Sequence, residues 1–113
     1  IVDFAHTPDA LENICHAIRQ SYPDRRLVVL FGCGGDRDRT KRPLMGQTVA
    51  KWADKIILTS DNPRTENPDR IIQDIENGIK GFSPLIKDSE RPRALQRALR
   101  DLADNEVLLV AGK

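Results

Sequence analysis

Residues 27–35 read LVVLFGCGG, and this stretch decides the fold of the 113-residue chain. A continuous run of five apolar residues is typical of a strand that is buried on both faces of a parallel sheet. The glycines that follow predict a tight turn, and the amphipathic stretch that begins near Pro43 predicts a helix. The stretch therefore predicts a parallel strand that leads through a glycine-rich loop into a helix.

The same alternation of strand and helix extends along the whole chain. Apolar or β-branched runs predict strands over residues 1–5, 27–32, 55–60, 85–87 and 106–111, with the fourth the weakest and suited to a sheet edge. Helices are predicted from Thr7 as N-cap, from near Pro43, from Asn67 as N-cap, and after Ser89. Their expected apolar faces are Leu11, Ile14, Cys15 and Ile18; Leu44, Met45, Val49, Trp52 and Ala53; Ile71, Ile72, Ile75 and Ile79; and Leu95, Ala98, Leu99 and Leu102. This order predicts an α/β fold, with a doubly wound, mostly parallel, Rossmann-like sheet and helices on both faces.

Composition limits the function classes. The chain has 18 Lys and Arg against 17 Asp and Glu, and only 4% aromatic residues, which argues against a nucleic-acid binder. No apolar run approaches the roughly 20 residues of a membrane span, so no membrane partner is expected. Cys15 and Cys33 suggest no disulfide framework, which favours a reducing cytoplasm. The apolar sequence at Ile1 and before Lys113 suggests one domain, residues 1–113, of a longer protein.

Unusual residues follow the predicted strands, and ligands of such sheets bind beyond the carboxyl ends of the strands. Residues 32–42 read GCGGDRDRTKR, which lets the backbone approach a ligand and offers alternating charges. Arg37 stands where a dinucleotide-binding fingerprint requires glycine, and no P-loop Gly-Lys-Ser/Thr follows. The alternative is a flexible turn with solvated charges.

Two further loops carry candidate residues. In the Asp61-Asn62-Pro63-Arg64 turn, the guanidinium suits a carboxylate and the amide can both donate and accept; the alternative is a β-turn with Arg64 in a surface ion pair. Near the start, Asp3 could take a ribose hydroxyl and His6 could line a base. The alternative there is an acidic helix N-terminus beside a structural histidine.

Neither cysteine suggests a metal site, because no Cys/His spacing typical of zinc is present. The glycines and basic residues around Cys33 could lower the pKa of its thiol, but without a paired histidine a packing role is favoured. Cys15 lies on an apolar helix stripe, so it is expected in the core.

Taken together, VDFAHTPDAL, FGCGGDRDRTKRPLMG, TSDNPRTENP and LLVAGK resemble the C-terminal domain of the Mur ligases, over essentially the whole chain. The resemblance implies an ATP-dependent amide-bond ligase of peptidoglycan synthesis. Such an enzyme phosphorylates the D-glutamate carboxylate of UDP-MurNAc-L-Ala-D-Glu, and the amine of an amino acid attacks the acyl phosphate. The Asp-Asn-Pro-Arg motif implies meso-diaminopimelate, rather than lysine, as that amino acid.

The binding roles known in the family are assigned here to the matching positions of this sequence. The resemblance implies that six residues bind meso-diaminopimelate: Arg37, Asp61, Asn62, Pro63, Arg64 and Gly112. Asp3 and His6 would lie beside the ribose and adenine of ATP. It implies no catalytic residue and no metal ligand within this chain, because the Mg²⁺ ligands and the phosphate-binding loop are expected in a central domain on which this domain packs. The isolated chain is therefore expected to be inactive.

Three departures from the family pattern qualify the resemblance. Phe4 stands where tyrosine is usual, which removes a hydroxyl, and Glu90 stands where aspartate is common. The last family motif continues as Gly-Lys-Gly-His-Glu, whereas this sequence ends at Lys113. The alternative interpretation is a stand-alone nucleotide-binding or regulatory α/β module.

Overall fold

The computed structural model describes residues 1–35, 38–82 and 84–112. Four helices and four strands alternate in these residues: α1 (Pro8–Ser21), β1 (Arg26–Phe31), α2 (Lys41–Trp52), β2 (Lys55–Leu58), α3 (Pro68–Glu76), β3 (Leu85–Lys87), α4 (Arg91–Asp101) and β4 (Glu106–Val110). The strands form a parallel sheet in the order β3-β2-β1-β4. The weakest predicted strand is thus at an edge, as expected.

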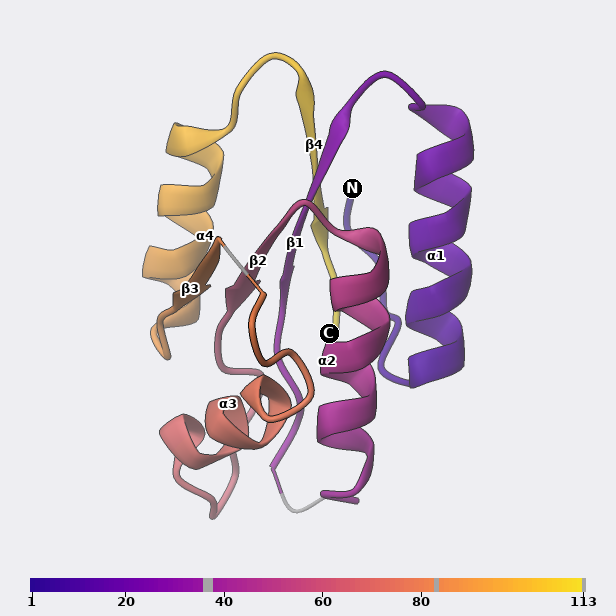
Figure 1. Ribbon diagram of the computed structural model, residues 1–113. Helices are drawn as coiled ribbons and strands as arrows, with labels where there is room; N and C mark the ends of the chain where they lie inside the picture. Colours follow the sequence, from indigo (N-terminus) through magenta and orange to yellow (C-terminus); the bar gives the residue numbers. More distant parts are fainter. Residues whose placement is uncertain (36–37, 83, 113) are drawn as a thin grey trace.

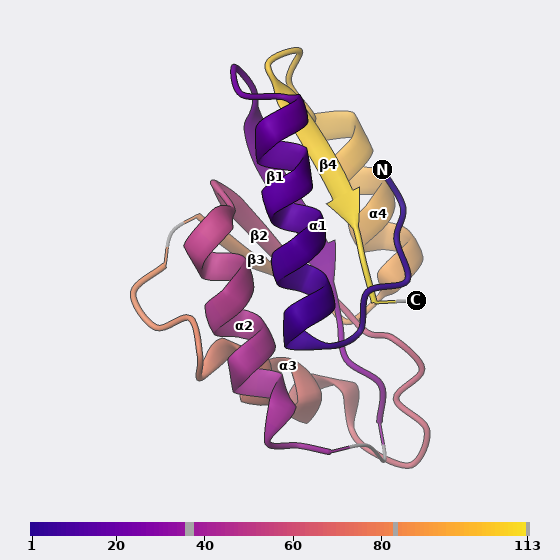
Figure 2. The same ribbon diagram turned by 90° about the vertical axis from the view of Figure 1, so that its right-hand side faces the viewer.

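Helices cover both faces of the sheet, which confirms the predicted α/β architecture (Figures 1 and 2). One face packs against α1, α2 and α3 through a core that contains Val29, Phe31 and Leu58. The other face packs Val28, Leu30 and Ile57 against Ala94 and Ala98 of α4. Because β1 lies in the middle of the sheet and is covered on both sides, its apolar run is continuous.

The predicted caps of α1 and α3 are confirmed. The Thr7 hydroxyl accepts a hydrogen bond from the Ala10 amide at 3.1 Å, and the Asn67 side chain accepts one from the Asp69 amide at 2.9 Å. Each side chain satisfies an amide that has no partner within its helix. Proline follows both caps. A capping side chain followed by proline therefore determines where each of these two helices begins.

The prediction of a strand over residues 1–5 was wrong. Only Val2 forms a bridge, to Val110 of β4, and Val2 and Phe4 are each 73% exposed. The Asp3 carboxylate accepts a hydrogen bond from the Ala5 amide at 3.1 Å, which turns the backbone away from the sheet. The segment therefore lies along the edge of β4 without joining it as a strand.

Two leucines predicted to lie in the core are exposed instead, Leu44 at 47% and Leu99 at 58%. In α2 the buried residues are Arg42, Met45, Gly46 and Val49, and Leu44 points about 150° away from the centre of their stripe. In α4, Ala94 and Ala98 face the sheet, and Leu99 points about 120° away from the line between them, toward solvent. Helix α2 also begins at Lys41, two residues before the predicted start, and Ile79 is buried just beyond the end of α3.

No helix in the described part of the chain combines the length and apolar character that a bilayer crossing requires. Both cysteines are free thiols. Cys15 is fully buried, as predicted, and its burial raises the pKa of the thiol to about 11.

Candidate functional site

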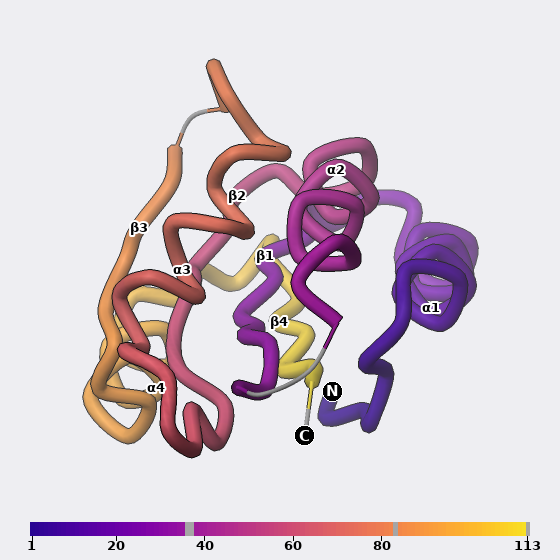
Figure 3. The backbone as a smooth tube through the Cα atoms, turned by 90° about the horizontal axis from the view of Figure 1, so that it is seen from below, coloured from indigo at the N-terminus to yellow at the C-terminus, as the bar shows by residue number. Residues whose placement is uncertain are grey.

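The carboxyl ends of β1, β2 and β4 meet at one edge of the sheet, which Figure 3 shows from below together with both chain ends. A cavity of about 550 Å³ opens there. Its lining includes five residues that the sequence analysis singled out: His6, Asp61, Asn62, Arg64 and Gly112. Loops that are far apart in sequence therefore converge as the topology predicts.

The other three candidates differ in position. Asp3 is not among the lining residues of the cavity, and its carboxylate is engaged with the Ala5 amide. Pro63 is also absent from the lining, but its carbonyl accepts a hydrogen bond from the Glu66 amide at 3.0 Å. Arg37 lies outside the described residues.

The loops of the site are packed backbone against backbone. A Cβ atom on Gly35 would collide with the carbonyl group of Pro63, and one on Gly32 would collide with the carbonyl oxygen of Thr59. Gly112 combines a φ of +89° with close packing on the carbonyl oxygen of Gly32. Glycine is therefore required in these loops by close approach, and at Gly112 also by backbone conformation.

The turn after β2 contains two non-glycine residues in the left-handed region, Asn62 with a φ of +39° and Arg64 with a φ of +53°. Such a conformation costs roughly 1–2 kcal/mol for a residue with a side chain. Two hydrogen bonds to the glycine loop hold the turn in place. The Gly35 amide donates to the Asn62 carbonyl at 3.0 Å, and Arg64 Nη1 donates to the Gly35 carbonyl at 2.9 Å.

Arg64 nevertheless lies at the surface and lines the cavity. A guanidinium has five N–H donors, so the bond to Gly35 leaves donors that can reach a ligand. The side chain is thus oriented by the loop while its charge faces the cavity. This position suits a carboxylate ligand, which can accept two parallel hydrogen bonds from a guanidinium.

His6 is exposed, and its Nδ1 donates to the carbonyl oxygen of Phe4 at 2.8 Å. This hydrogen bond fixes the ring at the entrance to α1, next to Thr7, which also lines the cavity. Nε2 of the neutral ring can then accept a hydrogen bond from a ligand.

The sequence analysis missed the residue that joins these loops, Arg42. Its side chain is only 1% exposed, although it is an arginine. It donates to both carboxylate oxygens of Glu66 at 2.8 and 3.0 Å, to Asp74 at 3.0 Å and to the Gly34 carbonyl at 3.2 Å. The hydrogen bonds with Glu66, opposed by burial, raise the pKa of the guanidinium.

Arg91 makes a similar connection on the opposite face of the sheet. From the first residue of α4 it donates to the Ser60 carbonyl at 3.1 Å and to the Ala111 carbonyl at 3.4 Å. These carbonyls follow β2 and β4, so the ends of both strands are tied to α4. The sequence signal for Arg42 is an arginine near the start of a helix that follows the glycine-rich loop, whereas Arg91 follows no loop that the sequence analysis singled out.

The cavity also exposes Cys33, whose Sγ lies 3.5 Å from Sδ of Met45. Burial raises the pKa of this thiol to about 12, and Arg42 opposes the shift only in part. Cys33 also packs against the core on this face of the sheet, which confirms the packing role.

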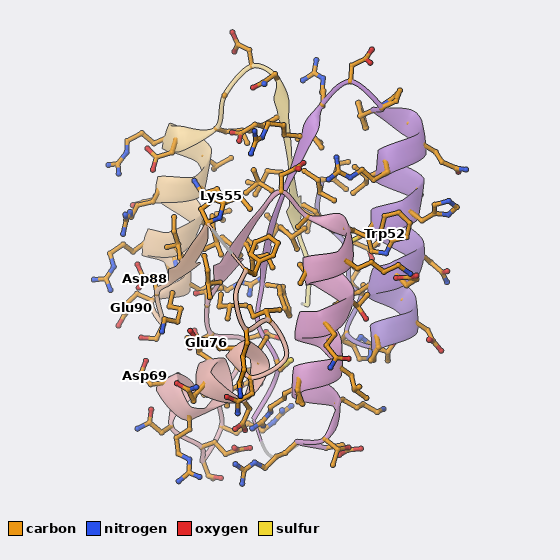
Figure 4. The ribbon with its side chains drawn as sticks, viewed as in Figure 1. Trp52, Lys55, Asp69, Glu76, Asp88 and Glu90 are labelled. Atoms are coloured by element: carbon orange, nitrogen blue, oxygen red, sulfur yellow. The ribbon has the colours of Figure 1, made fainter. Side chains whose placement is uncertain are left out.

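Acidic residues gather on α3 and near the start of α4, where Figure 4 labels Asp69, Glu76, Asp88 and Glu90. Glu76 is paired with Lys87 at 3.0 Å, and Asp88 with Arg93 at 2.7 Å. Within the described residues no group of three His, Cys, Asp or Glu side chains could hold a metal ion.

Comparison with known proteins decides the family. The model of the Mur ligase glutamate ligase domain matches residues 1–113. This chain belongs to the Mur ligase family. It resembles the UDP-N-acetylmuramoyl-L-alanyl-D-glutamate–2,6-diaminopimelate ligases of Leptospira borgpetersenii and Synechococcus elongatus, with identities of 52% and 50% over the full chain.

The solved structures agree with this assignment. One structure of a UDP-N-acetylmuramoyl-L-alanyl-D-glutamate–2,6-diaminopimelate ligase is 40% identical, with a TM-score of 0.90, over 99% of this chain and 23% of that chain. The chain spans 23% of the Leptospira relative and 22% of the Synechococcus relative. The Mur ligase fold and the family resemblance that the sequence predicted are thus confirmed.

Proposed function

We propose that this chain is the amino-acid-binding domain of an ATP-dependent ligase that joins meso-diaminopimelate to UDP-MurNAc-L-Ala-D-Glu in the cytoplasm. The observation that carries the proposal is the convergence of Asp61, Asn62 and Arg64 on the cavity at the ends of the strands. The printed names of the relatives at about half identity support the same reaction.

The chemistry of the cavity suits this amino acid. Meso-diaminopimelate differs from lysine by a second carboxylate on the carbon that carries its distal amine. Arg64 supplies the cation and the planar donors that a carboxylate prefers. Asp61 and the carbonyl oxygen of the Asn62 side chain can accept hydrogen bonds from the ammonium. The domain would therefore hold one end of the substrate and leave the other amine to attack.

ATP would be the second substrate met by this domain. His6 at the entrance to α1 would contact the adenosine part of the nucleotide, and Asp3 would lie beside the ribose. As the family resemblance implies, the phosphates and the Mg²⁺ ion would be held by another part of the protein. This division implies that the domain orients the amino acid and contributes no group to phosphoryl transfer.

The test is ligation by the full-length protein that carries this chain. It is incubated with UDP-MurNAc-L-Ala-D-Glu, ATP and Mg²⁺, together with meso-diaminopimelate, lysine or ornithine. We expect a product only with meso-diaminopimelate, detected by mass spectrometry, with one phosphate released for each amide bond formed. Equal use of lysine would contradict the assigned amino acid, and turnover without ATP would contradict the ligase mechanism.

A further inference from the structure

The conformation of residues 61–66, the segment that carries Arg64, depends on contacts with the rest of the domain. Two of its residues, Asn62 and Arg64, have left-handed backbones, and both are exposed. Strained conformations of this kind persist where the surrounding structure fixes them. A residue outside the segment must therefore hold these backbone conformations in place.

Arg42 is placed to do so. Glu66, two residues after Arg64, receives two hydrogen bonds from the Arg42 guanidinium, and the Glu66 amide in turn donates to the Pro63 carbonyl. The same guanidinium holds the Gly34 carbonyl, next to the Gly35 carbonyl that Arg64 itself contacts. One buried side chain thus reaches both loops on which the position of Arg64 depends.

The surrounding charges explain why an arginine is buried here. Asp74 on α3 contacts Arg42 at 3.0 Å and also Arg39 at 3.3 Å, so two carboxylates and two guanidiniums form one balanced network. A guanidinium can donate in several fixed directions at once, whereas the ammonium of lysine is a compact point charge. Nε of Arg42 has no hydrogen-bond partner in the described part of the chain, so its two terminal nitrogens make all of the contacts that the structure shows.

We propose that Arg42 is a positioning residue for amino-acid selection: its guanidinium holds Glu66 and Gly34 so that Arg64 faces the substrate. The inference rests on the proposed function and goes beyond it, because Arg42 acts through Arg64 without contacting the amino acid. It follows that replacing Arg42 should weaken binding of the amino acid only while Arg64 is present.

The experiment is a double-mutant cycle in the full-length protein, with Arg42→Lys, Arg64→Ala and the pair. We expect Arg42→Lys to raise KM for meso-diaminopimelate on the order of tenfold and to leave KM for ATP within about twofold. In the Arg64→Ala background the same substitution should change KM for the amino acid by less than about twofold. Additive effects, or equal effects on both substrates, would overturn the proposal.

Glu66→Gln provides a second route if Arg42→Lys does not fold. It preserves the shape of the side chain but removes the charge that Arg42 holds, so the same dependence on Arg64 is expected. Arg19→Lys is the matched control, because Arg19 also joins a backbone carbonyl, that of Trp52, to a carboxylate, that of Asp54, at the opposite end of the sheet. It should leave both KM values unchanged.

The outcomes separate the two proposals. A wild-type protein that does not use meso-diaminopimelate would contradict the proposed function itself. If the wild-type protein uses meso-diaminopimelate but the Arg42→Lys and Glu66→Gln variants have a normal KM for it, only the role of Arg42 is contradicted.

Discussion

Arg64 and Gly35 form a reciprocal link: the arginine side chain holds the glycine carbonyl at 2.9 Å, while the glycine amide holds the turn that carries the arginine. The link makes the position of a charged, exposed side chain depend on a loop that lies about 30 residues earlier in the sequence. A substitution at either residue should therefore change both the packing of the two loops and the binding of the ligand.

Replacing Arg64 should change the choice of amino acid. Loss of one partner of a desolvated ion pair costs about 2–5 kcal/mol, so Arg64→Ala in the full-length protein should lower kcat/KM for meso-diaminopimelate by a factor on the order of thirty to several thousand. Lysine lacks the distal carboxylate, so its poor use should fall far less. Steady-state kinetics with both amino acids measures the difference, and equal losses would mean that Arg64 only supports the loop.

Gly35→Ala should destabilise the domain by overpacking. The added methyl group meets the Pro63 backbone, and displacement of a packed backbone costs roughly 1–3 kcal/mol. Gly81 is the matched control, because a methyl group there meets nothing within 4 Å but the φ is +81°. Gly81→Ala should cost about 1 kcal/mol of unfolding free energy and leave ligation intact. Urea unfolding compares the two, and a Gly35→Ala variant with wild-type stability and activity would disprove the close packing.

Asp88 should make the fold sensitive to acid. Two hydrogen bonds from Arg93, at 2.7 and 2.8 Å, hold the pKa of the carboxyl at about 2, below its usual 3.8. The charged form is favoured by folding, so its contribution is present above about pH 4 and is lost as the pH falls through 2. Asp88→Asn should lower the free energy of unfolding by about 1–2 kcal/mol at pH 7 and by little near pH 2.

Urea titrations between pH 2 and 7 measure this difference, with Asp101→Asn on the exposed side of α4 as the control. A constant difference between Asp88→Asn and the wild type over that range would mean that the pair with Arg93 contributes nothing through charge.

The 113-residue chain alone should fold without ligating. It has a core on both faces of the sheet, but the family resemblance implies that the phosphate-binding loop and the Mg²⁺ ligands lie in another domain. We expect no ATP-dependent product and only millimolar binding of ATP. Trp52 is not among the lining residues of the cavity, and its indole donates to Glu12 of α1, so its fluorescence is a poor probe of the site. Calorimetry or amide chemical shifts should be used, and a micromolar constant would favour a stand-alone nucleotide-binding module.

The sequence predicts the sheet well because each buried strand is a continuous apolar run, and it predicts two helix starts because Thr7 and Asn67 are followed by proline. It also predicts which loops converge, since parallel strands end at one edge. The sequence could not predict the burial of Arg42, because nothing in the local sequence distinguishes a buried arginine from a solvated one. Its partners Glu66 and Asp74 are 24 and 32 residues away. The sequence wrongly predicts a strand over residues 1–5. Its valine and phenylalanine favour a strand, but the turn at Asp3 interrupts the extended backbone.

The bridge between Val2 and Val110 holds the segment before α1 against the end of β4, close to His6 and Gly112, which line the cavity. A fluorescent label attached to residues 1–5 would therefore crowd the cavity, and the change that it causes could be mistaken for ligand binding. Residues 103–105, between α4 and β4, lie at the opposite end of the molecule and are exposed (Figure 1). A label attached in that loop would report on the domain from a distance without touching the cavity.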